Sequence, residues 1–242
     1  MIRLLLAAAG LVAALVGRAG DIPVSWDADL APPADPAAYE RQLRAIVSDS
    51  RARVAAEIGI EPGPLLSVKI HSRAGYQRQF GAGAAHLDAA RFAGEVVHVN
   101  GGARLDDRFA GVVVHEMVHA ALDARGTASA LPRWLDEGLA ERLSWRRRGL
   151  EAPAPNQVAE LKQARERRDL VPLPRTGELS RQGYLGAWAA VVFLDGRFGR
   201  ERVMAMVRAT LGGATFEKAL RREMSLSPED LDAAFEAWVG GL

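Results

Sequence analysis

The stretch Val112-Val113-Val114-His115-Glu116-Met117-Val118-His119-Ala120-Ala121-Leu122 decides the fold and the site that we expect of this chain. On an α-helix, residues four apart face the same way and lie about 6 Å apart along the axis. His115 and His119 could therefore each direct a ring nitrogen at one zinc ion. Glu116 is rotated by about 100° from His115, so its carboxylate flanks that ion and suits a base for metal-bound water.

The sequence restricts the third protein ligand that a catalytic zinc site needs. The chain has no Cys, and no His follows His119, so a donor further along must be Asp or Glu. Leu122 and Arg125 stand where a metzincin would have Gly and His, which excludes that family. Asp123 continues the row of His115 and His119, but three ligands in a line cannot surround an ion. A helix with two incidental histidines stays an alternative at this point.

A second segment supplies carboxylates, Pro132-Arg133-Trp134-Leu135-Asp136-Glu137-Gly138-Leu139-Ala140-Glu141. Glu137 and Glu141 share one face of the predicted helix and have apolar neighbours. Burying two carboxylates is unfavourable unless a positive group meets them, so this helix is the better source of the third donor. The alternative is that both side chains lie in water beside the arginines that end the helix.

Together the two segments resemble the gluzincins, specifically the small bacterial peptidase MA-like metallohydrolases related to thermolysin and the zinc aminopeptidases. The family's second motif usually has Asn where this chain has Asp136. The resemblance implies that Glu137 is the third zinc ligand and that Glu141 supports a ligating His. It also implies a zincin-like fold, in which an edge strand, here 95–100, pairs with an extended substrate.

The implied reaction is hydrolysis of peptide bonds by a zinc-activated water. His115, His119 and Glu137 would hold Zn²⁺ and leave its fourth position to water, whose pKa zinc lowers to about 7. Glu116 would act as general base and return the proton to the leaving amine. Tyr184, near the start of an apolar helix, is the candidate donor to the oxyanion, and a buried structural Tyr is the alternative.

The rest of the sequence predicts an α+β fold, a small mixed sheet among active-site helices followed by a helical C-terminal subdomain. Residues 21–35 are expected to be extended, and strands are expected at 65–70 and 95–100. The expected helices are 36–58, 72–80, 106–123, 131–148, 156–168, 184–194, 200–211, 216–224 and one opening at Ser227. Arg146, Arg147 and Arg148 are expected to be a solvated helix end. The Pro-containing break at 149–155 divides the predicted metallopeptidase domain, 20–149, from the helical subdomain, 150–242.

The remaining histidines and two tryptophans have structural interpretations. His71 is expected to be structural, and His98 is expected on a strand surface, with contact to substrate as the alternative. His86 lies in a Gly/Ala loop that could move over the site. Trp134 and Trp188 are expected to pack in the core.

Residues 1–19 have the pattern of a secretory signal peptide. Arg3 precedes an apolar run from Leu4 to Val16, and Ala19 ends a small-residue cleavage site. An uncleaved anchor is the alternative, although the run is shorter than the ~20 residues that span a bilayer. The expected location is periplasmic or extracellular, with no stable membrane insertion after cleavage.

Charge and cysteine content exclude several classes of protein. The net charge is +1, and removal of residues 1–19 takes away two arginines and leaves −1, so nucleic acid is not expected as a partner. Without Cys there is no thiolate nucleophile, iron–sulfur cluster or Cys-based zinc site. The expected partner is a peptide or protein substrate. The alternatives are a binding module that kept the zinc fold without turnover and a zinc hydrolase of non-peptide amides.

Overall fold

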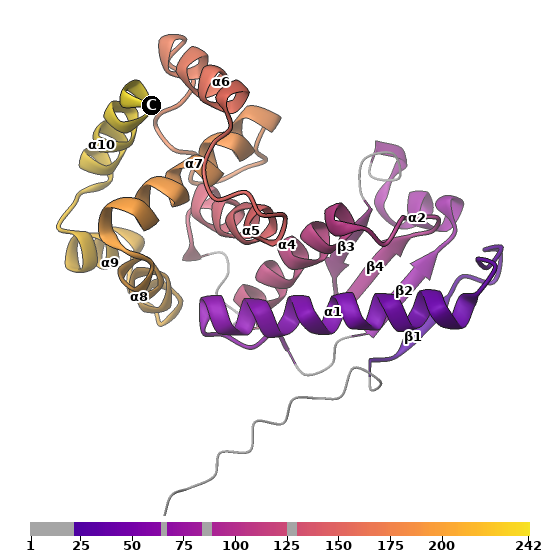
Figure 1. Ribbon diagram of the computed structural model, residues 1–242. Helices are drawn as coiled ribbons and strands as arrows, with labels where there is room; N and C mark the ends of the chain where they lie inside the picture. Colours follow the sequence, from indigo (N-terminus) through magenta and orange to yellow (C-terminus); the bar gives the residue numbers. More distant parts are fainter. Residues whose placement is uncertain (1–21, 64–66, 84–88, 125–129) are drawn as a thin grey trace, which may run out of the picture.

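The computed structural model describes residues 22–63, 67–83, 89–124 and 130–242. The predicted signal peptide and His86 lie outside these residues. Over the described residues the chain forms nine helices and a small four-stranded sheet, which confirms the α+β class (Figure 1). No helix in these ranges is long and apolar enough to cross a membrane.

The sheet has the order β1-β2-β4-β3, with strands Val24–Trp26, Ser67–His71, Ala90–Ala93 and Val96–Asn100 numbered along the chain. β1 pairs with β2 and β2 with β4 in parallel, whereas β3 is antiparallel to β4. The prediction that 95–100 is the edge strand is therefore wrong, since β4 is paired on both sides. β3, which the sequence analysis did not identify, forms the edge.

The two faces of the sheet carry different residues because side chains alternate along a strand. Val68 and Ile70 of β2 and Val97 and Val99 of β4 are at most 1% exposed and belong to the main core. Lys69 of β2 lies opposite His98 of β4. The short helix α2, Arg73–Phe80, contacts both strands, and its Phe80 ring packs against His98. Ser72 caps α2, as predicted.

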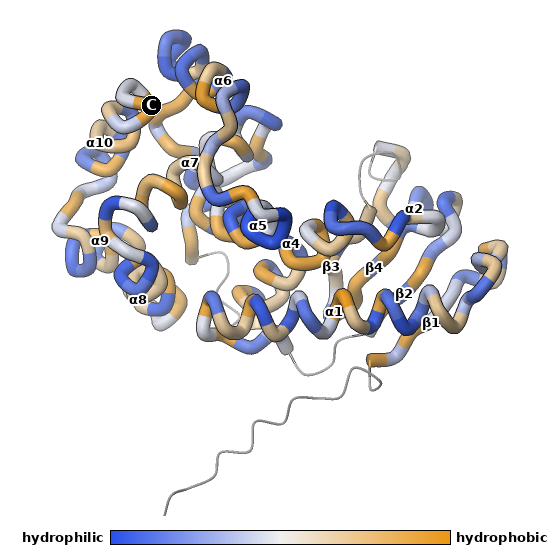
Figure 2. The backbone as a smooth tube through the Cα atoms, in the orientation of Figure 1, coloured by the Kyte–Doolittle hydropathy of each residue, from blue (hydrophilic) through white to orange (hydrophobic). Residues whose placement is uncertain are grey.

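Helices α1, Pro36–Ile58, and α4, Asp107–Asp123, pack together beside the sheet (Figure 1). The predicted bounds of both helices are confirmed. Gly59 ends α1 in a left-handed conformation with φ +73°, which glycine adopts without steric strain. Figure 2 shows α1 alternating between hydrophobic and hydrophilic residues, as expected for a surface helix, whereas α4 is largely hydrophobic along its length.

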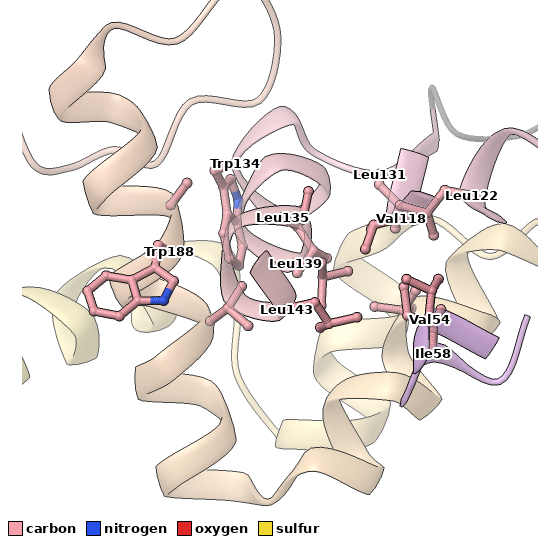
Figure 3. Packing of buried hydrophobic residues seen from close by; sticks show 14 of the residues in the cluster. Val54, Ile58, Val118, Leu122, Leu131, Trp134, Leu135, Leu139, Leu143 and Trp188 are labelled. Carbon is pink, nitrogen blue, oxygen red and sulfur yellow. The ribbon is translucent and has the colours of Figure 1, made fainter. Parts of the chain in front are cut away.

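Helix α5, Arg133–Arg147, lies between α4 and α7, Arg181–Phe198, and packs extensively on both. Its buried Leu135, Leu139 and Leu143 lie between Trp188 of α7 and the α1 residues Val54 and Ile58 (Figure 3). The predicted burial of Trp134 and Trp188 is confirmed, at 2% and 0% exposure. α7 is longer than the predicted 184–194, because Ser180 caps it four residues before Tyr184 and the helix continues to Phe198.

The remaining helices are α6, α8, α9 and α10, with bounds Pro155–Glu166, Arg200–Leu211, Phe216–Met224 and Pro228–Gly241. Ser227 caps α10 as predicted, through its side chain and the Asp230 N–H. One hydrophobic core extends from α1 to α10 and crosses the break at 149–155.

Candidate metal centre

Helix α4 presents His115 and His119 one turn apart. Asp106 caps the helix, because its Oδ1 accepts a hydrogen bond from the Phe109 N–H at 3.0 Å. Met117 and Val118 point into the core and are 0% exposed, which fixes the rotation of the helix. The two rings lie with their centroids 4.9 Å apart, and their Nε2 atoms approach to 3.2 Å. α4 therefore brings two imidazole nitrogens towards one point.

Helix α5 brings Glu137 to that point. Its Oε2 lies 3.3 Å from Nε2 of His115 and 3.5 Å from Nε2 of His119. The side chain is only 3% exposed, in keeping with its place between two packed helices. His115, His119 and Glu137 form the one group of His, Asp and Glu in the described ranges whose donor atoms could hold a metal ion together.

The spacing of the three donor atoms fits a tetrahedral ion. Zinc–nitrogen and zinc–oxygen bonds of about 2.0–2.1 Å at tetrahedral angles place the donor atoms about 3.3 Å apart. The observed separations are 3.2, 3.3 and 3.5 Å. Glu137 Oε2 is buried and forms no close hydrogen bond within the part of the chain that the structure describes, although both imidazole Nε2 atoms lie at 3.3–3.5 Å. A buried carboxylate oxygen needs positive charge or hydrogen-bond donors close to it, and a cation bound between the three donor atoms would meet that need.

In each imidazole, Nδ1, the nitrogen that does not face the other ring, contacts a carboxylate. Nδ1 of His115 lies 3.4 Å from Glu141 Oε1, and Nδ1 of His119 lies 3.0 Å from Asp136 Oδ1. Such partners fix the tautomer so that Nε2 keeps its lone pair for a metal. Glu141 is where the resemblance places it, beside a histidine of the group. Asp136 was noted only as a replacement for Asn, and its contact with His119 was not predicted.

Electrostatics at the group favour bound positive charge. Burial by itself would lower the pKa of His115, but the carboxylates of Glu137 and Glu141 raise it to about 10. Burial likewise opposes protonation of His119, and Asp136 and Glu137 raise its pKa to about 9. Burial would raise the pKa of Glu137, but its two histidine partners hold it well below the ordinary range. In the metal-free protein this charge is supplied by protons, which a metal ion would replace.

Arg133 and Tyr184 lie at the side of the group nearest α7. Nη2 of Arg133 is 2.5 Å from Oε1 of Glu137, and Nη1 is 3.2 Å from Oδ2 of Asp136. Burial raises the pKa of Tyr184, and the charge of Glu137 raises it further, while the positive charge of Arg133 opposes the shift. The structure thus places Tyr184 beside the group, and its proposed role towards an oxyanion stays a prediction. Arg133 was not predicted, since its sequence context indicated only a helix start.

Glu116 faces the sheet edge. Its Oε2 accepts a hydrogen bond from the Phe92 N–H of β3 at 2.5 Å. Glu116 and β3 are therefore held together beside the group, although Glu116 is not one of its three donor residues. Sequence patterns gave no sign of this contact because β3 itself was not predicted.

A chain of contacts leads from the group into the core between α5 and α7. Trp145 donates a hydrogen bond from Nε1 to Oε2 of Glu141 at 2.6 Å. The Trp145 ring stacks on Trp188 of α7 with centroids 4.5 Å apart. Because Glu141 in turn contacts His115, the position of this histidine depends on residues of the C-terminal helices.

The predictions for the remaining histidines require one correction. His98 does not lie on an exposed strand surface, because α2 covers it and leaves it 8% exposed. His71 is buried as well, with Nε2 2.8 Å from Nδ1 of His98 and Nδ1 3.2 Å from Oδ2 of Asp27. Burial lowers the pKa of both histidines. This pair is separate from the candidate metal centre.

Of the three arginines at the end of α5, Arg148 is exposed as predicted, whereas Arg146 and Arg147 are half-buried. Arg146 pairs with Glu57 of α1 and with Glu151, and Arg147 lies 3.5 Å from both Asp49 and Asp107. The guanidinium of Arg148 lies 5.7 Å from the Trp145 ring centroid. The prediction of a solvated end therefore holds for Arg148, whereas Arg146 and Arg147 form ion pairs that hold α5 to α1 and α4.

The chain matches no protein-family model and no curated protein.

Proposed function

We propose that the protein is a zinc-dependent metallopeptidase of the gluzincin type. The observation that carries the proposal is the convergence of His115, His119 and Glu137 at separations that suit one tetrahedral ion. Two imidazoles and one carboxylate are the protein ligands of catalytic zinc in thermolysin and carboxypeptidase A. Three protein ligands leave one position open, which distinguishes a catalytic site from a closed structural one.

The surroundings of the three ligands support this proposal. A bound histidine ordinarily donates its other ring N–H to a carboxylate or carbonyl, and Glu141 and Asp136 are placed for this. The antiparallel edge strand beside two packed helices also agrees with a zincin-like arrangement. In the proposed enzyme, the extended substrate pairs with β3 rather than with β4.

Glu116 is the proposed general base. A zinc ion held here would supply Lewis acidity, making water acidic enough to give hydroxide near neutral pH and polarising a carbonyl oxygen. Glu116 takes the proton from the attacking water and later gives it to the leaving amine. To do so, its carboxylate leaves the Phe92 N–H and turns to the reacting groups. Tyr184, whose raised pKa keeps its hydroxyl protonated, is the proposed donor to the developing oxyanion.

The test combines metal analysis with peptide cleavage. We expect the purified protein to retain about one zinc per chain and to cleave members of an unbiased peptide library. Glu116→Gln should keep the zinc and lower the cleavage rate by about 10²–10⁴-fold. Glu166→Gln, at an exposed position of α6, is the matched control and should leave the rate unchanged. Activity that persists in folded, zinc-free protein would overturn the proposal.

Export is part of the same proposal. The pattern of residues 1–19 predicts that the exported protein begins at Gly20. N-terminal sequencing of protein recovered from outside the cytoplasm tests this, and a chain that still begins at Met1 would contradict it.

A further inference from the structure

Arg133 contacts two carboxylates of the candidate metal centre at once. It opens α5, and Asp136 and Glu137 follow it by three and four residues, so all three side chains lie on one face of the helix. Its two terminal nitrogens divide between them, Nη1 to Asp136 and Nη2 to Glu137. A planar guanidinium can hold two acceptors in fixed directions, which a lysine ammonium cannot.

In each of these carboxylates, one oxygen contacts Arg133 and the other contacts a histidine. Oδ2 of Asp136 accepts a hydrogen bond from Arg133, and its Oδ1 contacts Nδ1 of His119. Oε1 of Glu137 accepts from Arg133, which leaves the buried Oε2 to face both Nε2 atoms. Arg133 therefore determines which oxygen of each carboxylate reaches the site.

We propose that Arg133 is the positioning residue of the metal centre, and that it makes Glu137 a ligand through Oε2 alone. The inference rests on the proposed function, because it needs a metal ion at the three donors. With Oε1 held by the guanidinium, Glu137 fills one coordination position and a fourth position stays open. With Arg133 removed, Oε1 is free to turn to the ion as a second ligand, and Asp136 is free to release His119.

If Arg133 acted only through its charge, its removal would change the zinc affinity in the opposite direction from that expected of a positioning residue. The Arg133 guanidinium is positive and lies next to the ligand Glu137, so by Coulomb repulsion its removal should tighten binding of a cation. A positioning role predicts weaker binding, because loss of the partners that orient metal ligands typically lowers metal affinity by about 10–100-fold. The direction of the change therefore separates the two roles without any assay of cleavage.

The experiment compares zinc affinity, measured against a chelator, in the full mature chain and its variants. Arg133→Gln should lower the affinity by about 10–100-fold, and Arg133→Lys, which keeps the charge but not the planar fork, should fall between Gln and wild type. Arg147→Gln is the matched control, because Arg147 lies on the same helix, is similarly exposed and also faces two carboxylates. Its zinc affinity should equal that of the wild type.

Cobalt(II) gives a second readout that a merely structural role would not change. At saturating cobalt, the visible bands of Arg133→Gln should be weaker than those of wild type, since five-coordinate cobalt absorbs less strongly than tetrahedral cobalt.

Unchanged or tighter zinc binding by Arg133→Gln would overturn the proposal, as would an unchanged cobalt spectrum. A wild-type chain that binds no zinc would overturn the metal centre and the role of Arg133 together. A wild-type chain that binds zinc but cleaves no peptide would overturn the peptidase alone, and the affinities would still decide the role of Arg133.

Discussion

At the scale of single residues, the site combines groups that the sequence identifies with groups that it does not. His115, His119, Glu137 and Glu141 follow from helical spacing and from the resemblance, and the structure brings them together. The contact of Asp136 with His119 depends on how two helices cross, which no local pattern encodes. The same holds for His98, whose strand position is correct but whose burial depends on α2.

The buried pair His71 and His98 predicts how stability depends on pH. Burial lowers both pKa values in the folded protein, and the positive charge of Lys69 acts in the same direction. Asp27 beside His71 and the Ala93 carbonyl beside His98 oppose the shift. The unfolded chain therefore binds more protons below the ordinary histidine pKa of about 6.5. The free energy of unfolding should then fall as pH decreases from 6.5 towards the lowered values, by up to about 1.4 kcal/mol per pH unit for each histidine.

The measurement is urea unfolding of the metal-free protein at pH 7, 6 and 5, for wild type and for His71→Gln/His98→Gln. His115 and His119 titrate in both proteins, so the difference between them isolates the pair. The stability advantage of wild type should shrink as pH falls. An advantage that is constant or grows towards pH 5 would contradict the prediction.

At the scale of elements, long helices were predictable and short strands were not. α1 and α4 are long and have capping residues at their N-terminal ends, so their bounds follow from the sequence. β1 and β3 have only three and four residues, too few for alternation to be distinguished from loop composition. They become strands by pairing with β2 and β4, which is a tertiary effect.

The crossing of α5 and α7 depends on the absence of a side chain at Gly138. A Cβ atom there would overlap the Ala187 carbonyl oxygen and come within 2.8 Å of Val191 Cγ2. Gly138→Ala should therefore destabilise the protein by about 1–3 kcal/mol and weaken zinc binding, since Glu137 is the adjacent residue.

Thermal or urea unfolding checks this, with Gly196→Ala of α7 as the control. Apart from the neighbouring residues and the backbone of α7 itself, no described atom lies within 4 Å of a Cβ at position 196, so the control should gain about 0.5–1 kcal/mol from helix propensity. Equal effects of the two substitutions would show that the close crossing is unimportant.

At the scale of the whole molecule, the predicted boundary at 149–155 separates stretches of chain that pack as one core. Trp188 of α7 stacks on Trp145 of α5, and the leucines of α5 face α1 on the other side (Figure 3). The sequence indicated the break correctly through its prolines, but a break in helical pattern does not reveal whether the two sides share a core.

A chain ending at residue 149 tests this packing. Without α7, the buried face of α5 is exposed to water and Trp145 loses the ring that holds it beside Glu141. We expect residues 20–149 to lack a cooperative unfolding transition and to bind zinc much more weakly than residues 20–242. A shortened chain that unfolds cooperatively with undiminished zinc affinity would instead establish two independent domains.

The hydrogen bond between Phe92 and Glu116 has a consequence for self-association. β3 is an edge strand, and an open edge is a template on which another chain can add a strand and begin aggregation. One outward donor of this edge is already taken by a carboxylate from the molecule's own helix. A second copy that added a strand through Phe92 would have to displace Glu116 and leave a negative charge at the new junction. Glu116, the side chain proposed for proton transfer, thus also disfavours the addition of a strand from a second copy to this edge of the sheet.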